Sequence, residues 1–149
     1  MPVDPEIRAA NARSTERIRA MAERLTEDAM RHPVGEHWTV AITLTHLAFW
    51  DRRALDSLRR SVAANAPTAA DVDIVVNDLS LPLWAAIPPS DAVRLALDAA
   101  REIDTFIATL EGPLTGVLLD AHPRWVRRHL HRDEHLDEAE AELRGGAGG

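Results

Sequence analysis

The sequence predicts an all-α protein, a bundle of four helices, and three observations carry that prediction. Apolar residues recur every three to four positions in four separate stretches, which is the period of a helix with one buried face. Pro and Gly residues lie between these stretches and end them. The single run that would suit a strand, Ile74-Val75-Val76, has no second strand pattern to pair with. Helices with one apolar face each bury those faces against one another, so we expect a four-helix bundle.

The length and charge of the chain limit the classes of function. With 149 residues we expect one domain over residues 1–144, followed by a flexible Gly-rich tail at residues 145–149. The net charge of −7 is spread along the chain without a basic stripe, which argues against nucleic acid as a partner. No apolar run approaches the roughly 20 residues that span a membrane, and the chain begins without an apolar signal region. We therefore expect a cytoplasmic protein.

The first helix is expected over residues 5–30. Asp4 suits the N-cap, and Pro5 suits the first helical position. The stripe of this helix is polar at its start, where it carries Asn11 and Ser14. We expect these two side chains to be solvated.

The second helix is expected to begin at Thr39, a good N-cap, and to end near residue 64. Its apolar stripe has Asp51 in the middle, and His46 and Trp50 lie along one edge of it. His46 should therefore face a crevice at the border of the core.

Residues 65–89 are expected to form a long connection, in which residues 72–83 fold as a short helix and then a loop. A connection of this length lets the third helix pack parallel to the second. The third helix should begin after Ser90 as its N-cap and end before Gly112-Pro113.

The fourth helix is expected over residues 123–143, and it carries His131 and His135. Side chains four residues apart stack on one face of a helix, so these two imidazoles can bind one metal ion from a single helix. His129 lies on the apolar stripe and is expected to pack in the core; it is the rival ligand if the helix is rotated by one residue.

A third metal ligand must come from another helix, and His46 is the best candidate. Three neutral imidazole nitrogens with an open fourth position form a catalytic type of zinc site. Imidazole also suits Ni, Fe and Cu, so the residues alone leave the metal open. The alternative is that these histidines are surface residues or hydrogen-bonded core residues.

Two motifs resemble the DinB-like superfamily, which includes DNA-damage-inducible DinB proteins, mycothiol-dependent maleylpyruvate isomerase and related thiol transferases. They are W-T-V-x-x-x-x-x-H-L-A-F-W-D at residues 38–51 and H-x-x-x-H-L at residues 131–136. The resemblance implies an up-down-down-up four-helix bundle with a long crossover between the second and third helices. It also implies a divalent metal, most often Zn or Ni, held by His46, His131 and His135, and a homodimer.

Further residues are expected around this site if consecutive helices form hairpins. The expected pocket residues, for which core packing is the alternative, are Trp38, Trp50, Met21, Leu25, Ala99 and Ile103. Asp51 and Arg132 each lie in the middle of an apolar stripe. A buried charge without a partner costs several kcal/mol, so we expect the two to pair in a structural role or to orient a ligand histidine.

The function expected from these features is that of a metal-dependent enzyme acting on a small electrophilic molecule. A bound metal would activate water or a thiol for thiol transfer, isomerisation or hydrolysis. The chain has no Cys, so any thiol must be an external low-molecular-weight compound such as mycothiol. The alternatives are a non-catalytic metal- or small-molecule-binding sensor or stress protein, and a metal-free helical dimer with Phe49 on its contact face.

Overall fold

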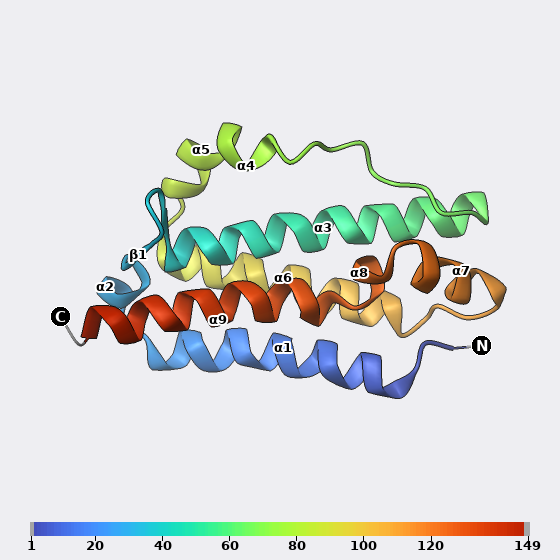
Figure 1. Cartoon of the computed structure of the whole chain (residues 1–149), viewed down its shortest axis with the longest axis horizontal. Helices are drawn as coiled ribbons and strands as arrows, with labels where there is room; N and C mark the ends of the chain where they lie inside the picture. Colours follow the sequence, from blue (N-terminus) through green and yellow to red (C-terminus); the bar gives the residue numbers. More distant parts are fainter. Residues whose placement is uncertain (1, 148–149) are drawn as a thin grey trace.

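The computed structural model describes the backbone of residues 2–147 and the side chains of residues 2–145. This part of the chain is mostly helical, which confirms the all-α class. Four long helices lie side by side (Figure 1): α1 (Pro5–Arg24), α3 (Val40–Ala64), α6 (Pro89–Ile107) and α9 (Arg128–Ala147). Helices α1 and α9 run in one direction, and α3 and α6 run in the other. Each of α3 and α1 contacts both α6 and α9.

The expected first helix is two helices. Helix α1 begins at Pro5, and the Asp4 carboxylate caps it as predicted by accepting a backbone N–H at 2.8 Å. It ends at Arg24 because Leu25 is extended, with φ −91° and ψ 140°. Thr26 then caps a new short helix, α2 (Glu27–Met30), through its hydroxyl.

A small antiparallel ladder occupies the connection to α3, where only a loop was expected. Its strands are β1 (Pro33–Val34) and β2 (Trp38–Thr39), and Val34 lies opposite Trp38. Gly35 turns the chain with φ +68°, a conformation that suits glycine. The ladder holds Trp38 beside the first turn of α3.

Helix α3 has the bounds that the sequence predicts. The Thr39 hydroxyl accepts the N–H of Ile42 at 3.1 Å, and the helix ends at Ala64 before Asn65, whose φ of 51° is left-handed. The chain beyond it is tied back onto the same helix. Two buried serine hydroxyls of α3 accept backbone N–H groups, that of Ser61 from Thr68 at 2.8 Å and that of Ser57 from Ala70 at 2.9 Å.

The crossover returns along α3 and covers its first half with two short helices, α4 (Val76–Leu79) and α5 (Leu81–Ala85) (Figure 1). Helix α6 therefore starts beside the beginning of α3 and runs parallel to it. The expected N-cap Ser90 lies inside α6, because the helix begins at Pro89, a residue that fits the first helical position.

The expected fourth helix is interrupted. After α7 (Pro113–Ala121), the short helix α8 (Pro123–Val126) ends at Arg127, whose φ of −85° and ψ of 67° are not helical. Helix α9 continues to Ala147, beyond the expected end of the domain at residue 144. The last two residues of the expected tail, 148–149, lie outside the described residues.

The break before α9 explains why Asn11 is buried rather than solvated. Its Oδ1 accepts the N–H of His129 at 3.0 Å, in the first turn of α9, and its Nδ2 donates to the carbonyl of Val126 at 2.8 Å. Ser14 is buried as well, since its hydroxyl accepts from Arg132. The polar start of the α1 stripe therefore faces α9, and the expectation of solvated side chains is wrong.

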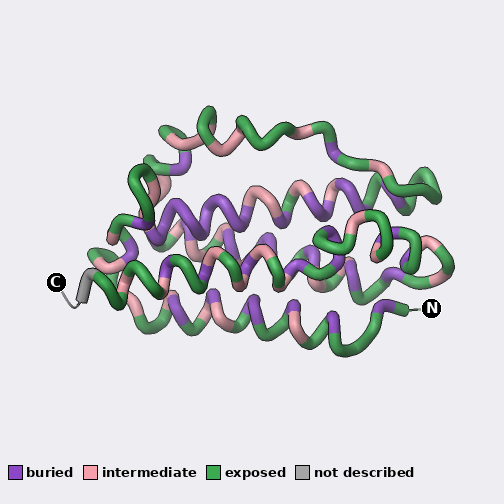
Figure 2. The backbone as a smooth tube through the Cα atoms, in the orientation of Figure 1, coloured by how far each residue is buried: buried purple, intermediate pink, exposed green. Residues whose placement is uncertain are grey.

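The core lies between the long helices, each of which carries buried residues at intervals along the chain (Figure 2). One apolar cluster centres on Leu44, Leu47 and Leu136, and a second on Leu58, Ile103 and Leu118. Within residues 2–147, no helix combines the length and apolar character needed to cross a membrane.

Candidate metal centre

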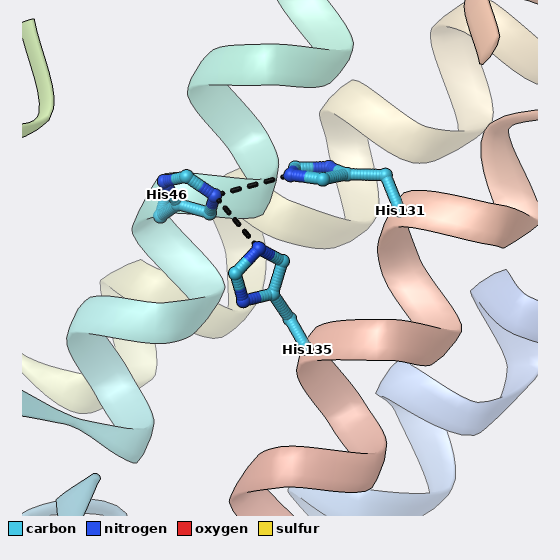
Figure 3. Close-up of side chains that lie close together, drawn as sticks. All are labelled: His46, His131 and His135. Carbon is cyan, nitrogen blue, oxygen red and sulfur yellow. Dashed lines mark hydrogen bonds between the residues drawn. The ribbon is translucent and has the colours of Figure 1, made fainter. Parts of the chain in front are cut away.

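Three imidazoles from two helices converge on one point (Figure 3). His46 comes from α3, and His131 and His135 come from successive turns of α9. The Nε2 atom of His46 lies 3.1 Å from Nε2 of His131 and 3.2 Å from Nε2 of His135. The structure thus brings together the three residues that the sequence selects, and one candidate ligand atom from each lies within 4.8 Å of the others.

The spacing of these nitrogens fits a shared metal ion. Three nitrogens bound at about 2.0–2.1 Å to one tetrahedral Zn²⁺ lie about 3.3 Å apart, close to the separations seen here. A set of three imidazoles also suits other divalent transition metals. The donor set is uncharged, so an ion bound to it would keep its full positive charge for a further ligand.

The environment keeps all three imidazoles neutral. Burial lowers the pKa of His46 to about 3, and the neighbouring His135 contributes to the same shift. Burial also lowers the pKa of His131 to about 2, assisted by the positive charge of Arg128, and burial lowers the pKa of His135. Only a neutral imidazole offers a lone pair to a metal, so no ring of the triad has to give up a second proton before an ion binds at pH 7.

Three tryptophans surround His46, whose residue surface is only 4% exposed. The ring centroid of Trp38 lies 4.6 Å from that of His46, Trp84 lies at 6.0 Å and Trp50 at 6.3 Å. Trp38 also stacks on His135 at 5.9 Å. The side chain of His135 keeps 20% of its surface exposed, so the triad has an apolar wall on the α3 side and access to solvent on the α9 side.

The second ring nitrogens of the triad meet three different groups. Nδ1 of His46 lies 3.2 Å from Oδ1 of Asn77, a residue of α4. Nδ1 of His135 lies 3.9 Å from a carboxylate oxygen of Glu138, and Nδ1 of His131 lies 3.5 Å from a guanidinium nitrogen of Arg128.

The expected pair of Asp51 and Arg132 is present, as part of a larger network. Nε of Arg132 donates to one oxygen of Asp51 at 3.0 Å, and Nε of Arg128 donates to the other at 2.8 Å. Arg132 also binds Asp104 of α6 at 2.9 Å. Two arginines and two carboxylates balance in charge, and the carboxylate of Asp51 is used by the arginines rather than by a ligand histidine.

Three of the six expected pocket residues, Met21, Ala99 and Ile103, belong to the apolar core, and a fourth, Leu25, is partly buried against it. The hairpin reasoning that selected them is wrong because, in the described part of the chain, α1 packs on α6 and α9 rather than on α3, and α9 packs on α1 and α3 rather than on α6. Arg132 reaches the carbonyl of Ala100 at 3.5 Å as well as Asp104. Trp38 and Trp50 do lie against the triad.

Three residues near the site are absent from the sequence-based expectations: Asn77, Trp84 and Arg128. Trp84 could have been selected from the sequence, because a large aromatic side chain within a Pro-rich connection needs a surface to pack on. Trp84 also covers Phe49, with ring centroids 5.9 Å apart, so Phe49 is not the open face that was expected. His129 is held by Asn11 at 3.1 Å, which accounts for it without a metal.

Comparison of the chain with protein-family models, with curated proteins and with solved structures finds no match.

Proposed function

We propose that this chain is a metalloprotein of the DinB-like superfamily that binds one divalent ion, Zn or Ni, through His46, His131 and His135. Its fold would be the up-down-down-up four-helix bundle of that superfamily, with α1, α3, α6 and α9 as the four helices. The convergence of three neutral Nε2 atoms, with separations of 3.1 and 3.2 Å from His46, is the observation that supports the proposal.

The activity we propose is attack of a thiol or water on a small electrophilic molecule. Three protein ligands leave a position open, and a divalent ion lowers the pKa of a water or thiol bound there to near neutrality. The tryptophans around His46 would keep bulk water from one side of the site.

A metal titration tests the proposal. The protein is purified without an affinity tag and stripped of metal, and its affinity for Zn²⁺ and Ni²⁺ is measured by competition with a chromophoric chelator. We expect one ion per chain. His131→Ala and His135→Ala each remove a direct metal ligand. Loss of a residue that only orients a ligand typically lowers metal affinity about 10–100-fold, so each of these variants should lose more than about 100-fold.

His37→Ala is the matched control, because its side chain is 74% exposed and lies outside the triad. It should bind metal as the unmodified protein does. Equal metal affinities of the His131, His135 and His37 variants would refute the site and, with it, the proposed metal-dependent activity.

A second measurement distinguishes an enzyme from a non-catalytic binding module. Co²⁺ replaces the ion, and its visible spectrum is followed while a low-molecular-weight thiol is added. A sulfur-to-cobalt charge-transfer band is expected if the open position accepts a thiolate. A spectrum that does not respond to thiol, azide or pH would favour a closed site without catalysis.

A homodimer is also part of the proposal, since the resemblance implies one. Three large apolar side chains of the crossover are strongly exposed: Ile74 at 73%, Leu79 at 72% and Leu83 at 70%. Such a group would be covered in a dimer. Sedimentation of the protein should give a dimer, and Leu79→Glu should shift it toward the monomer; a monomer at all concentrations would contradict this part.

A further inference from the structure

The crossover contributes one polar side chain to the metal centre, that of Asn77. Its Oδ1 lies 3.2 Å from Nδ1 of His46 and 2.8 Å from Nε1 of Trp50. Helix α4, which carries Asn77, lies over the first half of α3 (Figure 1), and α3 is the helix that carries both His46 and Trp50. The amide is thus fixed at two points, one of which is a candidate metal ligand.

The contact with Trp50 identifies the amide atom that faces His46. An indole N–H can only donate, so the amide atom 2.8 Å from it must be the oxygen and not the nitrogen. An amide oxygen can only accept. Nδ1 of His46, which lies against the same oxygen, must therefore carry a proton.

That proton decides the state of the other ring nitrogen. A neutral imidazole has one N–H, so a proton on Nδ1 leaves Nε2 with a free lone pair. Nε2 is the atom that faces His131 and His135. In water a neutral imidazole prefers to carry its proton on Nε2, the form that could not bind a metal there. The hydrogen bond to Asn77 reverses this preference.

We propose that Asn77 is the positioning residue of the metal centre, which holds His46 in the tautomer and orientation that bind the ion, and that Trp50 holds Asn77 in place. This inference rests on the proposed function, in which His46 is a ligand. Among the residues that the structure describes, Asn77 alone offers an acceptor within hydrogen-bond distance of an Nδ1 of the triad.

The other two ligands lack this arrangement. Glu138 is 3.9 Å from His135, too far for a direct hydrogen bond, and the neighbour of His131 is a donor, Arg128. Both histidines lie on α9, where the helix itself sets their spacing. His46 comes from α3 and has no partner ligand on its own helix, so the hydrogen bond from its Nδ1 to Asn77 is what selects its tautomer.

Two variants of Asn77 distinguish the effect of its hydrogen-bond acceptor from the effect of its size. Asn77→Asp keeps an oxygen that can accept from both His46 and Trp50. Asn77→Leu has a similar size and no acceptor. Trp50→Phe is a third variant, which removes the anchor and leaves the amide. Circular dichroism checks that each variant is folded, and if Asn77→Leu fails to fold, Trp50→Phe and Asn77→Asp still test the proposal.

The first measurement uses the metal-free protein and ¹⁵N NMR of the histidine rings. Nε2 of His46 should be unprotonated in the unmodified protein and in Asn77→Asp. In Asn77→Leu the proton should move to Nε2 in a large part of the molecules, and Trp50→Phe should lie between. A proton on Nε2 in the unmodified protein, or an unchanged tautomer in both Asn77→Leu and Trp50→Phe, would overturn the inference.

The second measurement is the Zn²⁺ affinity of the same proteins. Loss of a partner behind a ligand histidine typically costs 10–100-fold in affinity, so we expect about that loss for Asn77→Leu and little or no loss for Asn77→Asp. Equal Zn²⁺ affinity of Asn77→Leu and the unmodified protein overturns the positioning role alone. A different outcome is that the unmodified protein binds no Zn²⁺ and still has the His46 proton on Nδ1. That result would refute the proposed function and leave Asn77 only its effect on the His46 tautomer.

Discussion

Asp51 of α3 and Arg132 of α9 form an ion pair 3.0 Å long that is almost completely excluded from solvent. The relative exposure of the two side chains is 1% and 0%. Arg128 binds the second oxygen of the same carboxylate at 2.8 Å, one turn earlier on α9. One carboxylate thus fixes the face of α9 that is turned to α3, and His131 and His135 lie on that face.

The first prediction concerns the stability that this network provides. Asp51→Leu leaves two buried guanidinium groups without their shared partner, and breaking a buried pair in this way typically costs about 3–5 kcal/mol. Urea denaturation of the metal-free protein measures the loss. Asp56→Leu is the control, because its pair with Arg60 is exposed and such surface pairs contribute little to stability. Similar losses for the two variants would contradict the structural role of Asp51.

The second prediction concerns the joint between α1 and α9. Asn11→Ala removes the acceptor for the N–H of His129 and the donor to Val126, both in a buried setting. Leaving such groups unpaired should lower the free energy of unfolding by about 1–3 kcal/mol. His129→Ala removes only one contact of Asn11 and should cost less. The same loss in both variants would mean that the capping of α9 by Asn11 is unimportant.

The third prediction concerns pH in the metal-free protein. The pKa values of His46 and His131, lowered to about 3 and about 2, lie below the value of about 6.5 expected in the unfolded chain. Below that value the unfolded chain takes up protons that the folded protein excludes. The stabilising effect of the neutral imidazoles is therefore complete above about pH 6.5 and is lost as the pH falls toward about 3.

The measurement is the free energy of unfolding between about pH 7 and pH 4. Each excluded proton contributes a slope of about 1.4 kcal/mol per pH unit, so His46→Gln should flatten the dependence by up to that amount. His37→Gln, an exposed histidine outside the triad, serves as the control. A slope that is unchanged by His46→Gln would show that His46 is protonated in the folded state as readily as in the unfolded state.

The fourth prediction links metal binding to the crossover. An ion on Nε2 of His46 favours the form with a proton on Nδ1, which strengthens the hydrogen bond to Asn77; by linkage, each event stabilises the other. Zn²⁺ should therefore slow amide hydrogen exchange in residues 76–85. The effect should be weaker in Asn77→Leu. Residues 113–121, at the far end of α3, should exchange at the same rate with and without the ion.

Much of the site can be predicted from the sequence because it depends on local spacing. His131 and His135 share a helix face whatever surrounds them, and Thr39 caps α3 through its own hydroxyl. The charges of Asp51 and Arg132 lie in apolar stripes and have to be paired, so their contact follows from the cost of burying either one alone.

The contributions of Asn77 and Trp84 could not be predicted, because they depend on where the crossover lies in space. The spacing of apolar residues predicts a helix and its buried face, but it does not predict the path of an irregular connection. The breaks at Leu25 and Arg127 were missed for a related reason. At Leu25, the neighbouring Thr26 caps a new helix, and at Arg127 the break lets Asn11, far away in sequence, cap α9. The pocket predictions failed because consecutive long helices were assumed to pack as hairpins, whereas α1 and α3 each pack on α6 and α9.

The ligands of the bound ion test the proposed metal site most directly. X-ray absorption at the zinc edge is recorded on protein loaded with one equivalent of Zn²⁺. We predict scattering from three imidazoles bound at about 2.0–2.1 Å, with two remaining in His131→Ala. A shell of oxygen ligands, or the same number of imidazoles in the variant as in the unmodified protein, would contradict a site formed by His46, His131 and His135.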